Sequence, residues 1–188
     1  LLHRTDYTQP ALFALEVALY RLWESFGITA EVVIGHSVGE IAAAYIAGVF
    51  ELEDAARLVT ARGRLMQALP SQGTMASIGV DSDAVQKGIQ ALELDAQVGI
   101  AGQNSPRQTV ISGEDDAVHA VMAHFKEAGQ RVTELQVSHA FHSHLMEPML
   151  EDFRKEIANL FFFEPKIPVI SNVSGKKAGK EICSSEYW

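Results

Sequence analysis

The segment of the sequence best suited to chemistry is a serine between two glycines, Gly35-His36-Ser37-Val38-Gly39. It fits the pattern G-x-S-x-G, follows an apolar β-branched run and precedes a helix rich in alanine. In that context the glycines permit a strained turn and a close approach of strand and helix, and the serine hydroxyl is presented as a nucleophile. The next amide, that of Val38, would face a developing oxyanion. Ser37 is therefore the candidate nucleophile, and the alternative is a glycine-rich turn with an incidental serine.

A serine nucleophile needs a base, and histidine is the most common one. His119 and His124 fall on a predicted amphipathic helix. The side chain of His36 should point away from the hydroxyl of its neighbour, Ser37. The remaining candidates lie in residues 139–144, HAFHSH, which we expect to connect two subdomains. Ligand sites are common at such crossings, so this segment is expected to supply the base.

The histidines of this segment could instead bind zinc. His142 and His144 are too close in sequence to share a helix face, and no H-E-x-x-H motif or cysteine pair accompanies them. We therefore expect no metal site. A polar loop without chemistry is the remaining alternative for the segment.

Two groups of elements must position these residues. The first begins with an apolar helix from about residue 8 to residue 26, with Thr8 as its cap and Pro10 in its first turn. This helix is apolar on nearly every side, so we expect it to be buried. Further elements of this group are a buried strand at 30–34, helices at 39–48, 52–69 and 144–160, and a strand at 167–172.

The second group reads as strand, helix, two strands, helix and strand, at 74–80, 81–92, 98–101, 108–112, 114–128 and 131–137. The order β-α-β-β-α-β is typical of a ferredoxin-like unit. We predict an α/β fold with an α/β-hydrolase-like large subdomain, residues 1–72 and 138–188, truncated at both ends. The ferredoxin-like small subdomain, residues 73–137, is inserted into it.

Composition limits the possible functions. The chain has 188 residues, of which 47% are hydrophobic, enough to bury the core of a domain of ordinary size. A formal charge of −9 argues against non-specific nucleic-acid binding, and no apolar run is long enough to span a membrane. Cys183 is the single cysteine, which excludes an internal disulfide and fits a reducing compartment. We expect a cytoplasmic protein without nucleic-acid or membrane partners, and a piece of a longer polypeptide.

Along essentially its whole length the chain resembles the acyltransferase domain of type I polyketide synthases, which are relatives of the malonyl-CoA:acyl-carrier-protein transacylases. GHSVGE together with HAFH and an arginine between them is highly specific for this family. The segments that carry the resemblance are TDYTQPALFALEVAL, GHSVGE, RLVTARGRLMQ, GTMASIGV, NSPRQTVISG, VSHAFHSHLMEPML and PVISNVSGK.

The resemblance implies a role for each matching residue. Ser37 would attack the acyl thioester, and His142, the second histidine of HAFH, would take the serine proton. Arg62, in TARGRLMQ, matches the arginine that binds the free carboxylate of the extender acid. A guanidinium can grip a carboxylate with two parallel hydrogen bonds, whereas Arg57 and Arg64 read as ordinary helix-face residues.

Five further residues are placed beside the substrate by the same resemblance. HAFH accompanies malonyl in this family and YASH accompanies methylmalonyl, since a bulky Phe141 would fill the space that an α-methyl group needs. Val38, where a glutamine could stand, points the same way. Gln9 and Asn104 match polar residues near the pocket, and His36 belongs to the motif without an assigned chemical role.

The implied reaction is a two-step exchange with no bound cofactor. Malonyl-CoA esterifies the serine, and the phosphopantetheine thiol of an acyl carrier protein then takes the malonyl group. A ketosynthase domain of the same polypeptide is the expected neighbour. The family draws a second oxyanion donor from a GQG segment and orients its histidine with a backbone carbonyl beyond the final Tyr187-Trp188. We expect both to lie outside this chain and the chain alone to have little activity.

Two alternatives belong to other functional classes. A serine esterase or thioesterase of the α/β-hydrolase type also uses G-x-S-x-G, but the aspartates considered as its third member fall in the predicted insert. A non-catalytic domain that retains the fold is the second alternative, and the presence of serine, arginine and histidine argues against it.

Overall fold

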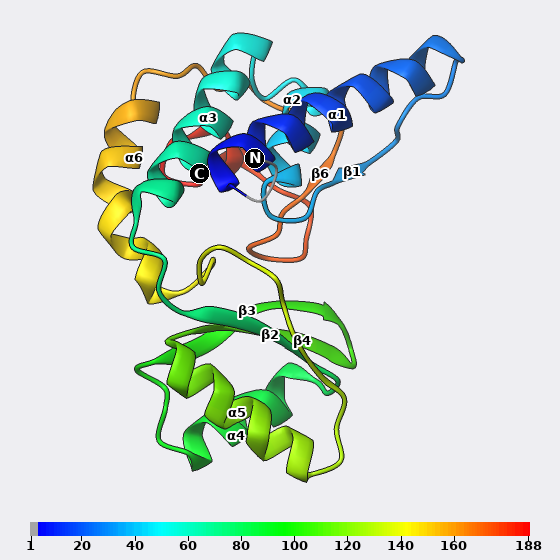
Figure 1. Cartoon of the computed structure of the whole chain (residues 1–188). Coiled ribbons are helices and arrows are strands. Elements are labelled where there is room, and N and C mark those ends of the chain that lie inside the picture. The colour runs from blue at the N-terminus through cyan, green and yellow to red at the C-terminus, as the bar shows by residue number, and fades with distance from the viewer. Residues whose placement is uncertain (1–3) are drawn as a thin grey trace. The chain divides into compact units, whose positions relative to one another are not determined.

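The computed structural model describes residues 4–188, which form two compact units, each containing helices and strands (Figure 1). One unit combines the residues up to Leu65 with Glu151–Trp188, and the other is Met66–Leu150. The structure is therefore of the α/β class, as predicted. The predicted insert, residues 73–137, lies inside the second unit, which extends beyond it at both ends.

The first unit is mainly helical, with one short parallel sheet. Strands β1 (Val33–Ile34) and β6 (Val169–Ile170) pair in parallel, with Val33 opposite Val169. A strand was predicted over 30–34 and expected to be buried, but β1 is shorter and Ile34 is 70% exposed, because β6 is its single partner among the described residues. The helices are α1 (Thr5–Ser25), α2 (Gly39–Ala47), α3 (Leu52–Ala68), α6 (Leu150–Ile157) and the 3₁₀ segment η2 (Lys180–Cys183).

Helix α1 differs from its prediction in two ways. It begins at Thr5, so Thr8 is not its cap and Pro10 lies in its interior. The expectation that it is buried on every side is wrong for the described residues. Its buried positions recur every fourth residue and form one stripe, whereas several large apolar side chains on its other faces are about half exposed. The stripe is Thr5, Gln9 and Phe13, and the exposed side chains include Leu15, Leu19, Leu22 and Trp23.

The second unit contains the predicted β-α-β-β-α-β order. Its sheet has the strand order β3-β4-β2-β5, and all its pairs are antiparallel, which is the arrangement of a split βαβ unit. A 3₁₀ segment, η1 (His144–Met149), follows the last strand. The six elements are β2 (Thr74–Ile78), α4 (Ser82–Ala91), β3 (Val98–Ser105), β4 (Gln108–Gly113), α5 (Asp115–Glu127) and β5 (Val132–Glu134).

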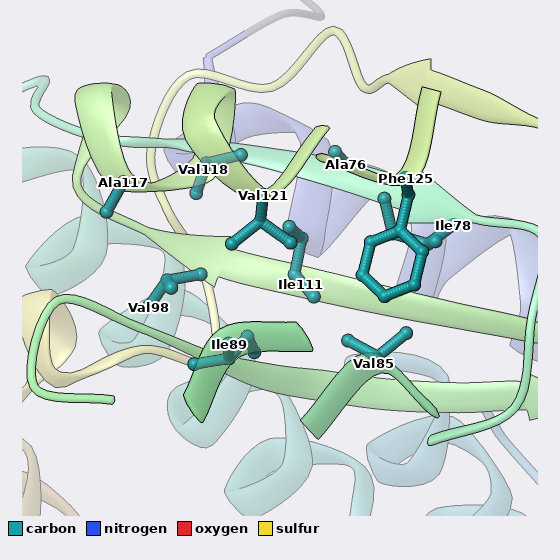
Figure 2. Close-up of a cluster of buried hydrophobic side chains, with 10 residues drawn as sticks. All are labelled: Ala76, Ile78, Val85, Ile89, Val98, Ile111, Ala117, Val118, Val121 and Phe125. Carbon is teal, nitrogen blue, oxygen red and sulfur yellow. The ribbon is translucent and has the colours of Figure 1, made fainter. Parts of the chain in front are cut away.

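Helices α4 and α5 cover one face of this sheet (Figure 1), and apolar side chains fill the space between. Figure 2 shows Val85 and Ile89 of α4 and Val121 of α5 gathered around Ile111 of β4. Each fully buried aliphatic side chain of this size stabilises the fold by about 1.5–3 kcal/mol. The apolar positions that recur along the predicted helices and strands are thus the positions whose side chains form this core.

Two elements differ from their predicted boundaries. Strand β3 continues through two register irregularities to Ser105, so Asn104 lies on this strand and not between the predicted strands 98–101 and 108–112. The helix predicted at 144–160 is split into η1 and α6. Pro148 lies in η1, where its ring and missing N–H disfavour a regular α-helix.

Candidate active site

The turn that carries Ser37 has an unusual backbone. Ser37 has a φ of 52°, in the left-handed region that non-glycine residues rarely occupy and that costs about 1–3 kcal/mol. A Cβ atom at position 35 would overlap the backbone of Gly39 and Glu40, so the turn requires Gly35. A Cβ atom on Gly39 would lie 3.4 Å from a carboxylate oxygen of Glu16, close to an ordinary contact. The first glycine is therefore a steric necessity, and the second is not.

The amide that follows the serine is available to a ligand. Val38 is the N-cap of α2, and across residues 4–188 its N–H meets no hydrogen-bond acceptor. The positive end of the helix dipole lies at the same place. A negatively charged oxygen beside Ser37 would be stabilised by both, as the predicted oxyanion role requires.

Arg62 of α3 reaches the serine. Its Nη2 lies 3.3 Å from Ser37 Oγ, and its Nη1 donates to Gln9 Oε1 at 2.5 Å. Burial lowers the pKa of Arg62 to about 10, so the guanidinium stays protonated near neutral pH. No ion pair within residues 4–188 includes Arg62. The site therefore holds a positive charge that no described carboxylate neutralises.

Gln9 and Gly63 set the position of this guanidinium. Gln9 is 5% exposed, and its Nε2 donates to Thr5 Oγ1 at 2.8 Å, which turns the amide oxygen toward Arg62. A Cβ atom at Gly63 would lie 2.9 Å from the carbonyl oxygen of Thr5. The absence of a side chain at position 63 therefore allows α3 to approach the first turn of α1, and Gln9, one turn further along α1, reaches Arg62.

The other two arginines of α3 are different. Arg57 pairs with Glu53 at 2.7 Å, and Arg64 pairs with Glu156, with both arginine side chains more than half exposed. Exposed pairs of this kind contribute about 0–1 kcal/mol. Arg62 is thus the arginine of this helix that contacts Ser37.

The three histidines of residues 139–144 have distinct surroundings in the second unit. His139 is fully buried, with Nε2 3.1 Å from the carbonyl oxygen of Leu69 and Nδ1 3.0 Å from Ser138 Oγ. A carbonyl can only accept, so Nε2 carries the proton and Nδ1 accepts from the serine hydroxyl. Both nitrogens of His139 are engaged, which makes it a structural residue.

His142 is the exposed histidine of the HAFH motif. Its φ is 58°, one of three positive values among described residues other than glycine, and Ser37 has another. Strained backbone of this kind clusters at functional sites. By contrast, His144 Nε2 lies 3.7 Å from Glu114 Oε1.

The predicted site residues are distributed over both units. The structure brings Gln9, Ser37 and Arg62 together in the first unit, where His36 is exposed on the turn and Val38 follows it. The second unit contains Asn104, exposed on β3, together with Phe141, which is half-buried with its ring 5.9 Å from that of His139, and His142. Within residues 4–188 there is no cluster of His, Cys, Asp or Glu side chains suited to a metal ion, and no helix has the length and apolar character to cross a bilayer.

One partner of the turn was missed by sequence reasoning. The N–H of Ser37 donates to Asn172 Oδ1 at 3.2 Å, across 135 positions of the chain. Asn172 in turn donates from its own N–H to Glu40 Oε1 at 3.1 Å. Ser37 and Glu40 belong to GHSVGE, and Asn172 belongs to PVISNVSGK, two motifs that carry the resemblance. Motif membership alone does not say which residues contact one another.

Comparison with known proteins decides the family. The profile of the family described as "Acyl transferase domain" matches residues 1–188.

The chain belongs to the acyl transferase domain family. This acyl transferase chain is 50% identical over 188 residues to polyketide synthase GfsA of Streptomyces halstedii, covering 100% of the chain and 2% of that protein. It is similar to the acyltransferase domain from the second module of the salinomycin polyketide synthase, with a TM-score of 0.95 and 48% identity over 100% of the chain and 44% of the other. FabD from Acinetobacter baumannii matches with a TM-score of 0.91 and 37% identity, over 99% of the chain and 61% of FabD. The chain thus spans less than two thirds of each of these proteins.

The turn geometry predicts different responses to two similar substitutions. Gly35→Ala should destabilise the protein at the upper end of the range of about 1–3 kcal/mol for overpacking, because the methyl group meets backbone that cannot move aside. Gly39→Ala, the matched control, should change the free energy of unfolding by less than about 1 kcal/mol. Urea denaturation of both variants measures the difference, and equal effects would contradict the steric account.

Proposed function

We propose that this acyl transferase domain moves a malonyl group from malonyl-CoA to the phosphopantetheine thiol of an acyl carrier protein, by way of an ester on Ser37, in polyketide biosynthesis. The observation that carries the proposal is the pairing of Ser37 Oγ with Arg62 Nη2 at 3.3 Å. A nucleophile beside an unneutralised guanidinium suits an acyl group that carries a carboxylate of its own. Malonyl is a small acyl group of this kind.

Charge gives this site its selectivity for the acyl group. The contacts of Arg62 with Gln9 and Ser37 leave other N–H donors of the guanidinium for the malonyl carboxylate. A charge-assisted hydrogen bond contributes about 1.5–3 kcal/mol, which corresponds to roughly 10- to 150-fold selection over an uncharged acyl group. The hydrogen bond that Arg62 donates to Gln9 orients the guanidinium before the substrate arrives, which reduces the entropy lost on binding.

The chemistry proceeds in two balanced steps. In the first, Ser37 Oγ attacks the thioester carbonyl, its proton passes to the imidazole of His142, and the sulfur of coenzyme A leaves and takes up that proton. In the second, the carrier thiol gives its proton to the imidazole of His142 and attacks the seryl ester, and the oxygen of Ser37 leaves and takes up that proton. The Val38 amide stabilises the oxyanion of both tetrahedral intermediates. The exposure and strained backbone of His142 support its role as the base, since His139 has both nitrogens engaged.

The partners follow from this reaction. The acceptor is the acyl carrier protein, and a ketosynthase domain of the same polypeptide would use the loaded malonyl group. The name of the relative GfsA, a polyketide synthase, supports this context. Acyl exchange changes no oxidation state, so the proposal requires no bound cofactor. A single cysteine and a coenzyme A substrate favour a cytoplasmic location.

Loading of Ser37 tests the proposal directly. Incubation of the complete domain with malonyl-CoA should add one malonyl group to the peptide that contains Ser37, and a carrier protein supplied afterwards should remove it and become labelled. Ser37→Ala should show neither signal. Intact-protein and peptide mass spectrometry provide the measurement. Release of free malonate at the same rate with and without carrier protein would indicate an esterase instead.

Arg62 should control the choice between malonyl and acetyl groups. Arg62→Ala should lower kcat/KM for malonyl-CoA by roughly 10- to 150-fold and affect acetyl-CoA much less, because the lost interaction is with the carboxylate. Arg64→Ala removes an exposed arginine of the same helix and should leave the ratio unchanged. Steady-state loading rates with both thioesters check this, and an equal loss for the two acyl groups would remove the assigned role.

Phe141 should control the choice between malonyl and methylmalonyl. Phe141→Ser should raise the ratio of methylmalonyl to malonyl loading by roughly 5- to 150-fold, since one methyl group in a fitted pocket is worth about 1–3 kcal/mol. The same change at Phe161, which is 71% exposed, is the control and should leave the ratio unaltered. Competition between the two thioesters, read by mass spectrometry, gives the ratio. An unaltered ratio in the Phe141 variant would contradict the steric explanation.

A further inference from the structure

The side chain of Asn172, distant in sequence, holds the strained turn at Ser37 by hydrogen bonds. The carboxamide of Asn172 accepts from the N–H of Ser37 at 3.2 Å through Oδ1, and its Nδ2 donates to the carbonyl oxygen of Gly35. The two backbone groups flank His36 on either side. A single planar amide thus fixes the path of the chain from Gly35 to Ser37, which the left-handed φ of Ser37 would otherwise disfavour.

Asn172 is itself held by the helix that follows the turn. Its N–H donates at 3.1 Å to Oε1 of Glu40, which lies in the first turn of α2 and is 7% exposed. A carboxylate is favourable near the N-terminus of a helix, and a buried one needs hydrogen bonds to remain charged. The contacts therefore close a loop from Ser37 through Asn172 and Glu40 back to the helix that begins beside the serine.

Tyr187 completes the arrangement at Glu40. Its hydroxyl lies 2.5 Å from Glu40 Oε1 and 2.6 Å from Ser171 Oγ. Burial, with the hydrogen bond to Glu40, raises the pKa of Tyr187 to about 12, so the phenol keeps its proton at working pH. The carboxylate can only accept, so that single proton goes to Glu40, and the hydroxyl of Ser171 donates to Tyr187.

We propose that Asn172, Glu40 and Tyr187 are positioning residues that hold the nucleophile turn in its reactive conformation. The inference rests on the proposed role of Ser37 as nucleophile and assigns none of the three a contact with substrate. Asn172 acts on the backbone of the turn, Glu40 fixes Asn172 relative to α2, and Tyr187 fixes the carboxylate of Glu40. Loss of any of them should slow the attack by Ser37 more than it weakens binding of the acyl-CoA.

The residue type at position 172 provides a sharp test. Asn172→Asp keeps the shape of the side chain, but it replaces the donor to Gly35 with an oxygen that repels the carbonyl. The matched control is Asn159→Asp, which makes the same chemical change on an exposed residue after α6. The probe is a fluorophosphonate, which phosphonylates an activated serine with release of fluoride and does not depend on malonyl recognition.

We expect Asn172→Asp to lower the rate of phosphonylation of Ser37 by roughly 10- to 100-fold, since two backbone hydrogen bonds are affected. Asn159→Asp should stay within about 2-fold of the parent. The single-turnover rate of malonyl loading should fall in parallel, while KM for malonyl-CoA and the malonyl to acetyl ratio stay within about 3-fold. A purely structural defect would instead alter binding, melting temperature and both rates together.

The outcomes separate this inference from the proposed function. If the parent reacts with the fluorophosphonate at Ser37 but transfers no malonyl group, the proposed function fails and the positioning test still stands. If folded Asn172→Asp reacts at the parental rate, the positioning role is wrong. Should Asn172→Asp not fold, Tyr187→Phe, which removes one hydroxyl, decides: a roughly 3- to 10-fold slower phosphonylation supports the inference, and an unchanged rate overturns it.

Discussion

The geometry of the site depends on the close approach of backbone to backbone at Gly35. The chain leaves β1, passes Gly35 against the backbone of Gly39 and Glu40, and enters α2 with no room for a side chain between. This reversal goes with the left-handed backbone of Ser37 and leaves the amide of Val38 at the helix N-terminus. The backbone positions of Ser37 and of the Val38 amide thus depend on the absence of a side chain at position 35.

The site around Ser37 carries a positive charge, although the net charge of the chain is negative. Acidic residues outnumber basic ones, 24 to 15, yet among the described residues no acid pairs with Arg62. Partial burial makes the charged form of Arg62 less favourable, and the neutral partner Gln9 satisfies part of the guanidinium without cancelling its charge. The surface arginines Arg57 and Arg64 pair with glutamates at little energetic consequence. An uncompensated charge next to Ser37 suits an anionic ligand, as the proposed function requires.

The sequence predicted well the features that local patterns encode. The elements of the second unit, and helices α2 and α3, follow from apolar periodicity together with capping and glycine signals. The family resemblance implied that Arg62 and Ser37 belong to one site, but spacing alone does not bring a position on α3 to the turn before α2, and their contact is seen only in the structure. The contact of Asn172 with the turn had no local signal, since it joins segments 135 positions apart. The exposure of α1 was missed because an apolar pattern predicts that a helix packs against other residues. The pattern does not say which residues those are, or whether they pack against every face of the helix.

Gly63, which carries no side chain, influences the position of the Arg62 guanidinium. A larger side chain there would meet the first turn of α1 and move it outward, taking Gln9 away from the guanidinium. The positive charge would remain, but the guanidinium of Arg62 would be held less firmly in one orientation. Under the proposed function, substitution at this helix crossing would relax the choice of acyl group while Ser37, Gln9 and Arg62 themselves are left unaltered.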